Sequence, residues 1–198
     1  MTTRQQSKAG TRGFEGGILG LWWALAGAAA WTLAGPAGVA MTEDGNTLGR
    51  TMLSFGLGAI LAGVLQGWLL RQTGLARDWI RAGIVMVALT AFWVFGAGTL
   101  VTEWGLFGIA LLGPALGLVQ WRLLRRRIPR AGWWVAATTV GWCLGGFLIG
   151  ADSFDMDLAT GGDPGNPAGW AVFGGAYGIV TGLAITWLMR QSSGGNAS

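Results

Sequence analysis

Six long apolar runs are the feature that most constrains what this chain can fold into. Each run is about 17–22 residues long, and at about 1.5 Å of helical rise per residue this matches the roughly 30 Å hydrocarbon core of a bilayer. Runs of this length exceed ordinary strands and favour helices. The sequence therefore predicts an all-α integral membrane protein with six transmembrane helices, at about 17–38, 53–70, 82–101, 105–121, 131–150 and 169–189.

The composition agrees with this interpretation. Hydrophobic residues make up 52% of the 198 residues and charged residues only 11%, whereas a soluble domain carries about 25% charged residues. The 37 glycines and 13 tryptophans are typical of closely packed membrane helices with aromatic side chains at the interfaces. The chain has no histidine and one cysteine, Cys143, so the usual general base and any disulfide framework are lacking.

The six runs are related to one another as repeated helical hairpins. The second, fourth and sixth runs end in the similar segments GVLQGWLLR, GLVQWRLLR and GLAITWLMR, whose last residues are Arg71, Arg125 and Arg190. The third and fifth runs both begin with RAG, and the first and fifth share a WW pair. Self-similarity of this kind predicts a repeated supersecondary unit. We predict three repeated helical hairpins, at about 17–72, 81–125 and 130–190.

Charged residues fall on alternate sides of the runs and predict the topology. Every lysine and arginine except Arg50 lies on the side that holds both termini, whereas most acids lie on the Arg50 side. A basic excess in short loops marks the cytoplasmic side. We therefore predict a cytoplasmic tail at 1–16, a transmembrane domain at 17–190 and a cytoplasmic tail at 191–198. The acidic loop 152–167 lacks the spacing of a calcium-binding loop, and no metal site is predicted.

Five arginines gather in the segment VQWRLLRRRIPR after the fourth run. The simplest interpretation is a topology anchor that contacts anionic lipid headgroups, each arginine contributing about 1 kcal/mol near the surface. No nucleic-acid recognition fold accompanies the positive charge, so nucleic-acid binding is not expected. The five are Arg122, Arg125, Arg126, Arg127 and Arg130.

Most tryptophans lie near the predicted membrane surfaces, where an aromatic belt is expected. Trp31, Trp93 and Trp142 lie deeper, beside small residues, and we predict that at least two of them are buried in protein. The alternative is a site for a flat apolar ligand such as a carotenoid, a quinone or a lipid tail. The belt is predicted to comprise Trp22, Trp23, Trp68, Trp79, Trp121, Trp133, Trp134 and Trp187 on the cytoplasmic side, and Trp104 and Trp170 on the other.

Small and polar residues inside the runs predict helix contacts. Glycines four residues apart let helix backbones approach closely, although the pattern does not say whether the partner helix belongs to this chain. Gln66 and Gln120 lie about one turn inside the arginines, and a buried amide needs a hydrogen-bond partner. An interhelical bond is the main interpretation and a ligand contact the other. The glycines are Gly63, Gly67, Gly113, Gly117, Gly141, Gly145, Gly174, Gly178 and Gly182.

Two short elements resemble those of a known group of proteins. The segments QWRLLRR at 120–126 and AGWW at 131–134 are similar to QWxxLRR and AGWW elements of uncharacterised bacterial multi-pass membrane proteins. This resemblance implies a bacterial inner-membrane protein and carries no activity. The three-hairpin plan is also similar to that of mitochondrial carriers. The similarity is limited to architecture, because the charged signature of the carriers' odd-numbered helices is missing here.

These observations favour a non-enzymatic membrane protein. The leading hypothesis is an accessory, scaffold or assembly subunit that packs against other membrane helices or holds an apolar ligand. The alternative is a transporter of small solutes or lipids, with a path between the three hairpins. Transporters coupled to ions usually carry charged residues at mid-membrane depth, and this sequence places none there. Without histidine, an acyl-transfer triad of the usual form cannot be assembled.

Overall fold

The computed structural model describes the backbone of residues 3–41, 47–96, 98–148 and 167–194, and the side chains of 17–41, 53–89, 111–148 and 167–191. Within this part of the chain the fold is all-α and contains no strand, which confirms the predicted class. Six long helices are present: α1 (Thr3–Ala40), α2 (Thr47–Leu69), α3 (Ala76–Gly96), α4 (Gly98–Leu124), α5 (Trp133–Leu148) and α7 (Pro167–Gly194); a short 3-10 helix, η1, covers Arg71–Thr73.

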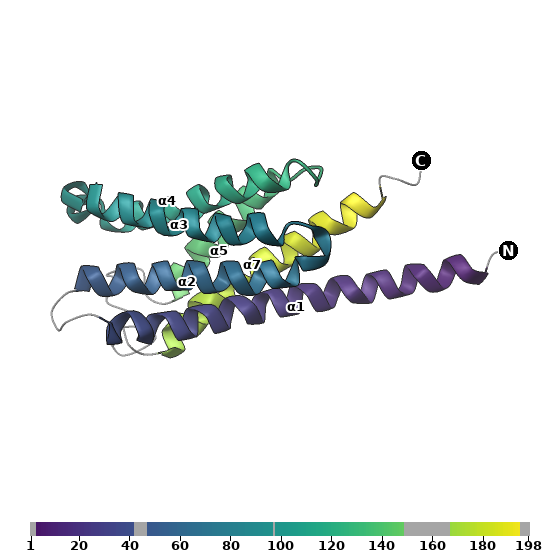
Figure 1. The fold of residues 1–198 in the computed structure, drawn as a ribbon, viewed down its shortest axis with the longest axis horizontal. Coiled ribbons are helices and arrows are strands. Elements are labelled where there is room, and N and C mark those ends of the chain that lie inside the picture. Colours follow the sequence, from purple (N-terminus) through teal and green to yellow (C-terminus); the bar gives the residue numbers. More distant parts are fainter. Residues whose placement is uncertain (1–2, 42–46, 97, 149–166, 195–198) are drawn as a thin grey trace.

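Each predicted run forms the body of one helix, and the differences lie at the ends. The break between α3 and α4 comes at Gly96 and Gly98, earlier than the expected link near 102–104, and glycine is a poor helix former. Helix α1 already begins at Thr3, within the predicted tail. Its 38 residues correspond to about 57 Å, and its N-terminal part extends beyond the other helices (Figure 1).

The helices are arranged as a closed ring. Each long helix packs against the next along the chain, and α7 packs against α1. Both chain ends lie at the same end of the bundle as the α2–α3 and α4–α5 connections (Figure 1). We call this the arginine end, because residues 71–81 and 122–130 bring most of the described arginines to it. The two connections contact each other there, since the Arg127 guanidinium donates to the Thr73 carbonyl at 2.8 Å.

Helices α1 and α7 close the ring by packing backbone against backbone. A Cβ at Gly178 would lie 2.8 Å from the Ala24 Cα, and one at Gly174 would lie 2.6 Å from the Gly27 carbonyl oxygen. A Cβ at Gly182 would lie 2.7 Å from the Gly20 carbonyl oxygen. Glycine is therefore required at these crossing points, because no side chain fits between the two backbones.

Two of the described helical stretches, Gly17–Ala40 and Pro167–Gln191, are long and apolar enough to cross a membrane. Shorter apolar stretches occur at Leu53–Leu69, Leu111–Leu124 and Trp133–Leu148. These helices favour a membrane protein, and the six-span arrangement stays a prediction. Inside the ring the buried side chains form two aromatic-rich clusters, and one of them includes residues of the two connections at the arginine end.

Candidate functional site

The cluster nearer the arginine end is built around three tryptophans, which we call the tryptophan triad: Trp23 of α1, Trp79 of α3 and Trp134 of α5. Each ring meets the other two edge-on, with centroids 5.3 to 6.0 Å apart. All three side chains are at most 1% exposed. The prediction that these residues belong to an interfacial belt is therefore wrong. They fill the centre of the ring.

Each indole N–H of the triad donates to a polar side chain on a neighbouring helix. Trp134 donates to Gln120 Oε1 at 2.8 Å, and Trp79 donates to Gln66 Oε1 at 3.4 Å. Trp23 donates to Thr181 Oγ1 at 3.1 Å. An indole N–H can only donate, so it fixes each glutamine with the amide oxygen toward the triad and the NH2 group away from it. The predicted interhelical bonds of Gln66 and Gln120 are confirmed.

The second cluster contains Trp31 and Trp142, at 3% and 5% exposure. Trp31 lies parallel to Trp170 with centroids 5.9 Å apart and meets Phe173 edge-on at 4.9 Å. The prediction that at least two of the three deep tryptophans are buried is confirmed by this pair. Trp93 lies outside the described side chains. Trp170, predicted for the belt, is 1% exposed and belongs to this cluster, so that prediction is also wrong.

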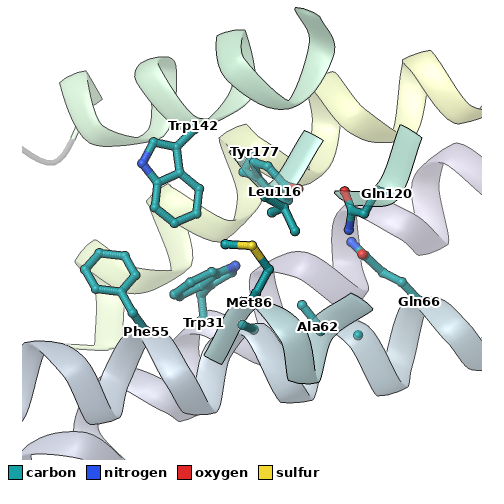
Figure 2. A pocket seen from close by; sticks show the side chains of 12 residues that line it. Trp31, Phe55, Ala62, Gln66, Met86, Leu116, Gln120, Trp142 and Tyr177 are labelled. Atoms are coloured by element: carbon teal, nitrogen blue, oxygen red, sulfur yellow. The ribbon is translucent and has the colours of Figure 1, made fainter. Parts of the chain in front are cut away.

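A small cavity of about 30 Å³ separates the two clusters. It is lined by Gln66 and Gln120 on one side and by Trp31, Trp142 and Tyr177 on the other. Figure 2 shows the two glutamine amides facing one another at its edge. Such a volume holds one or two water-sized occupants. A carotenoid, a quinone or a lipid tail is far too large for the space beside these tryptophans.

Two buried nitrogen atoms at this cavity have no hydrogen-bond partner. They are Trp31 Nε1 and Gln66 Nε2, on side chains that are 3% and 2% exposed. A buried donor without a partner is uncommon in proteins and calls for an explanation. Among the cavity-lining residues there is no charged side chain. The cavity is therefore a neutral, largely aromatic chamber, and its two buried, unpartnered side-chain atoms are both donors.

The predicted packing glycines all contact helices of this same chain. Gly63 and Gly67 of α2 face α3, and a Cβ at Gly63 would lie 3.3 Å from the Gly83 Cα. Gly113 and Gly117 of α4 face Trp142 and Thr138 of α5, respectively. Gly141 and Gly145 of α5 face Tyr177 and Phe173 of α7, respectively. Gly174, Gly178 and Gly182 of α7 face α1. Their partners thus lie within the ring.

The five predicted headgroup arginines are exposed at the arginine end. Arg127 caps the α2–α3 connection through Thr73, and the Arg125 guanidinium lies 5.0 Å from the Trp121 ring centroid. Arg130 adopts a left-handed backbone with φ 59°. Arg122 and Arg126 are also exposed, so none of the five side chains is buried.

A second hollow lies on the outside of the ring, between α1 and α7. This groove has a volume of about 500 Å³. Its lining includes small residues of α1, large apolar side chains of both helices and two polar residues of α7: Gly17, Gly20, Leu21, Ala24, Ile179, Leu183, Trp187, Thr186 and Arg190. Sequence reasoning missed this groove, because the α1 glycines were not among those singled out. Their spacing along α1 is the signal that could have found it.

No cluster of three or more histidine, cysteine, aspartate or glutamate side chains that could hold a metal occurs among the residues described. The four aspartates of the acidic loop 152–167 lie outside them. Comparison of the chain with protein-family models, with curated proteins and with solved structures gave no match.

Proposed function

We propose that the chain is a non-enzymatic, six-span protein of the bacterial inner membrane that serves as an accessory or assembly subunit. In this proposal the arginine end is cytoplasmic, and the outer face of the ring contacts lipid and one partner helix. Large apolar side chains on that face support a membrane location, among them Leu21, Leu33, Trp133, Phe147 and Leu183, which are 60–75% exposed.

The observation that carries the proposal is the groove between α1 and α7. The interior of the ring is filled by two aromatic clusters, which leaves the outer face for function. The lining combines small residues and large apolar side chains with Thr186 and Arg190, and small residues let a second helix approach closely inside a bilayer. A Cβ at Gly17 would have nothing within 4 Å among the described residues, which supports an edge of the groove that a partner can reach.

Photo-crosslinking in native membranes tests this proposal. A photoreactive side chain replaces either Leu183, which lines the groove at 67% exposure, or Leu33, which is 62% exposed and not among the groove residues. We expect one discrete protein adduct from position 183 and lipid adducts alone from position 33. Equal patterns at both positions would contradict a partner in the groove.

A matched pair of glycine variants sharpens the test. Gly17→Leu would fill the groove, and Gly146→Leu would add the same bulk to α5, where a Cβ also has nothing within 4 Å. Because a Cβ at either position has open space among the described residues, both variants should fold as the parent does, and their thermal midpoints check this. We expect Gly17→Leu to abolish the adduct and Gly146→Leu to leave it unchanged.

A transporter of small solutes is the second candidate, favoured by the cavity at the centre of the ring and its two glutamines. Gln66 and Gln120 line it from two different helices, and transporters often place their sites where repeats meet. Aromatic clusters lie on either side of the cavity, so transport requires their rings to move apart. Uptake of small neutral solutes and ions into proteoliposomes tests this candidate, and rates equal to those of empty liposomes would reject it.

A further inference from the structure

The central cavity presents hydrogen-bond donors without matching acceptors. Trp31 Nε1 and Gln66 Nε2 are buried and unpartnered, and both residues line the cavity. An indole nitrogen and an amide NH2 group can donate but cannot accept. What belongs beside them is therefore an atom that accepts hydrogen bonds.

The orientation of the glutamines is set from outside the cavity. The Trp79 and Trp134 indoles donate to the amide oxygens of Gln66 and Gln120, so these oxygens are already engaged. Rotating either amide by 180° would place its NH2 group against an indole N–H, and two donors cannot bond. The amides face one another in Figure 2, and their nitrogens point away from the triad into the space between the clusters.

We infer that this cavity binds one small monatomic anion of the size of chloride. Its volume of about 30 Å³ suits one such ion. A water molecule also accepts hydrogen bonds, but it brings two hydrogens that need acceptors. Among the lining side chains such a water would find the Tyr177 hydroxyl and the second lone pair of each glutamine oxygen, which already accepts from an indole. An anion needs no acceptor at all.

Burial of an anion is costly unless its surroundings compensate. Hydrogen bonds to a charged acceptor are about twice as strong as neutral ones, and the edges of aromatic rings carry partial positive charge. The cavity offers both, through its donors and through Trp31, Phe55 and Trp142. The arginine end adds positive potential, because Gln66 lies only five residues, or about 7–8 Å along the helix, before Arg71.

Equilibrium dialysis with radioactive chloride tests the inference. The full-length protein is purified in gluconate, in detergent, and dialysed long enough for exchange through the closed ring. We expect saturable binding of one chloride per chain, competition by bromide, and none by sulfate at equal ionic strength. Absence of saturable binding would overturn the inference, and the cavity would then hold water or stay empty.

A conservative variant assigns the binding to this cavity. Trp31→Phe keeps an aromatic ring and removes an N–H that bonds to nothing in the protein, so the fold should survive; its thermal midpoint in gluconate checks this. We expect its chloride affinity to fall about tenfold, the usual effect of losing one hydrogen bond to a charged group. Trp133→Phe, at an exposed ring of the same chain, is the matched control. Unchanged affinity in Trp31→Phe would show that chloride binds elsewhere.

Discussion

Four buried tryptophans differ in what their indole N–H groups contact, and this difference predicts an order of stability losses. Replacement by phenylalanine removes the N–H and part of the ring at each position. The smaller ring costs about 1 kcal/mol everywhere through the space that it leaves. The hydrogen bond then separates the variants, because the donor distances are 2.8 Å for Trp134, 3.1 Å for Trp23 and 3.4 Å for Trp79, and Trp31 has no partner.

For Trp134→Phe we expect a total loss of about 2–3 kcal/mol, because Gln120 Oε1 would be left buried without a donor. Trp79→Phe should lose less, about 1–2 kcal/mol, since its bond is long. Trp31→Phe removes a buried donor that is already unsatisfied, and this gain offsets the smaller ring, so its net change should be near zero. The predicted order of losses is thus Trp134, then Trp23, then Trp79, then Trp31.

The free energy of unfolding is measured by titrating detergent-solubilised protein with SDS, in chloride-free buffer so that no anion contributes. Circular dichroism follows the helices. The double variant Trp134→Phe with Gln120→Leu should recover part of the loss, because it removes the orphaned oxygen as well. Equal losses at all four positions, or a loss at Trp31 as large as at Trp134, would refute the reasoning from hydrogen bonds.

Three further predictions follow from local geometry. Gly178→Ala should lose about 1–3 kcal/mol of unfolding free energy, because its Cβ would lie 2.8 Å from the Ala24 Cα in a backbone contact that cannot relax. Its control, Gly175→Ala, has open space around the Cβ and should gain up to about 1 kcal/mol of unfolding free energy. A loss of stability in both variants would contradict this account. Gly74→Ala should lower the thermal midpoint, because φ is 71° there and a left-handed residue with a Cβ costs about 1–2 kcal/mol. Cys143 is exposed on α5, and in a membrane-spanning α5 that face is covered by lipid. In proteoliposomes a water-soluble maleimide should then label Cys143 only after SDS is added. Immediate labelling would argue against a membrane span.

The helices could be predicted from the sequence because length and apolar composition are local properties. The burial of Trp31 and Trp142 also followed from small residues on the same helical faces. The triad could not be predicted in this way, because a tryptophan near the end of an apolar run can face either lipid or protein. The deciding feature is a polar side chain on a neighbouring helix that accepts a hydrogen bond from the indole N–H. The similar spacings, 13 residues from Gln66 to Trp79 and 14 from Gln120 to Trp134, are the sequence signal that indicates these pairs.

The contact between α1 and α7 was beyond sequence reasoning for a different reason. The triplet Gly174, Gly178 and Gly182 predicted a close neighbour for α7 but did not say which helix this is. The neighbour is set by closure of the ring, which depends on all the helices between them. The central cavity is likewise the space that several helices leave together, and no local pattern in one helix encodes it.

Closure of the ring by the first and last helices has a consequence for how the protein is made. Trp23 and its partner Thr181 are 158 residues apart in the chain, and ribosomes add about 5–20 residues per second. Trp23 therefore waits about 8–30 s after its own synthesis before its acceptor exists. During that interval the glycine face of α1 has no α7 to cover it, so any chaperone or quality-control protease that surveys nascent helices meets this face first. A chain truncated before α7 would keep the glycine face of α1 uncovered permanently.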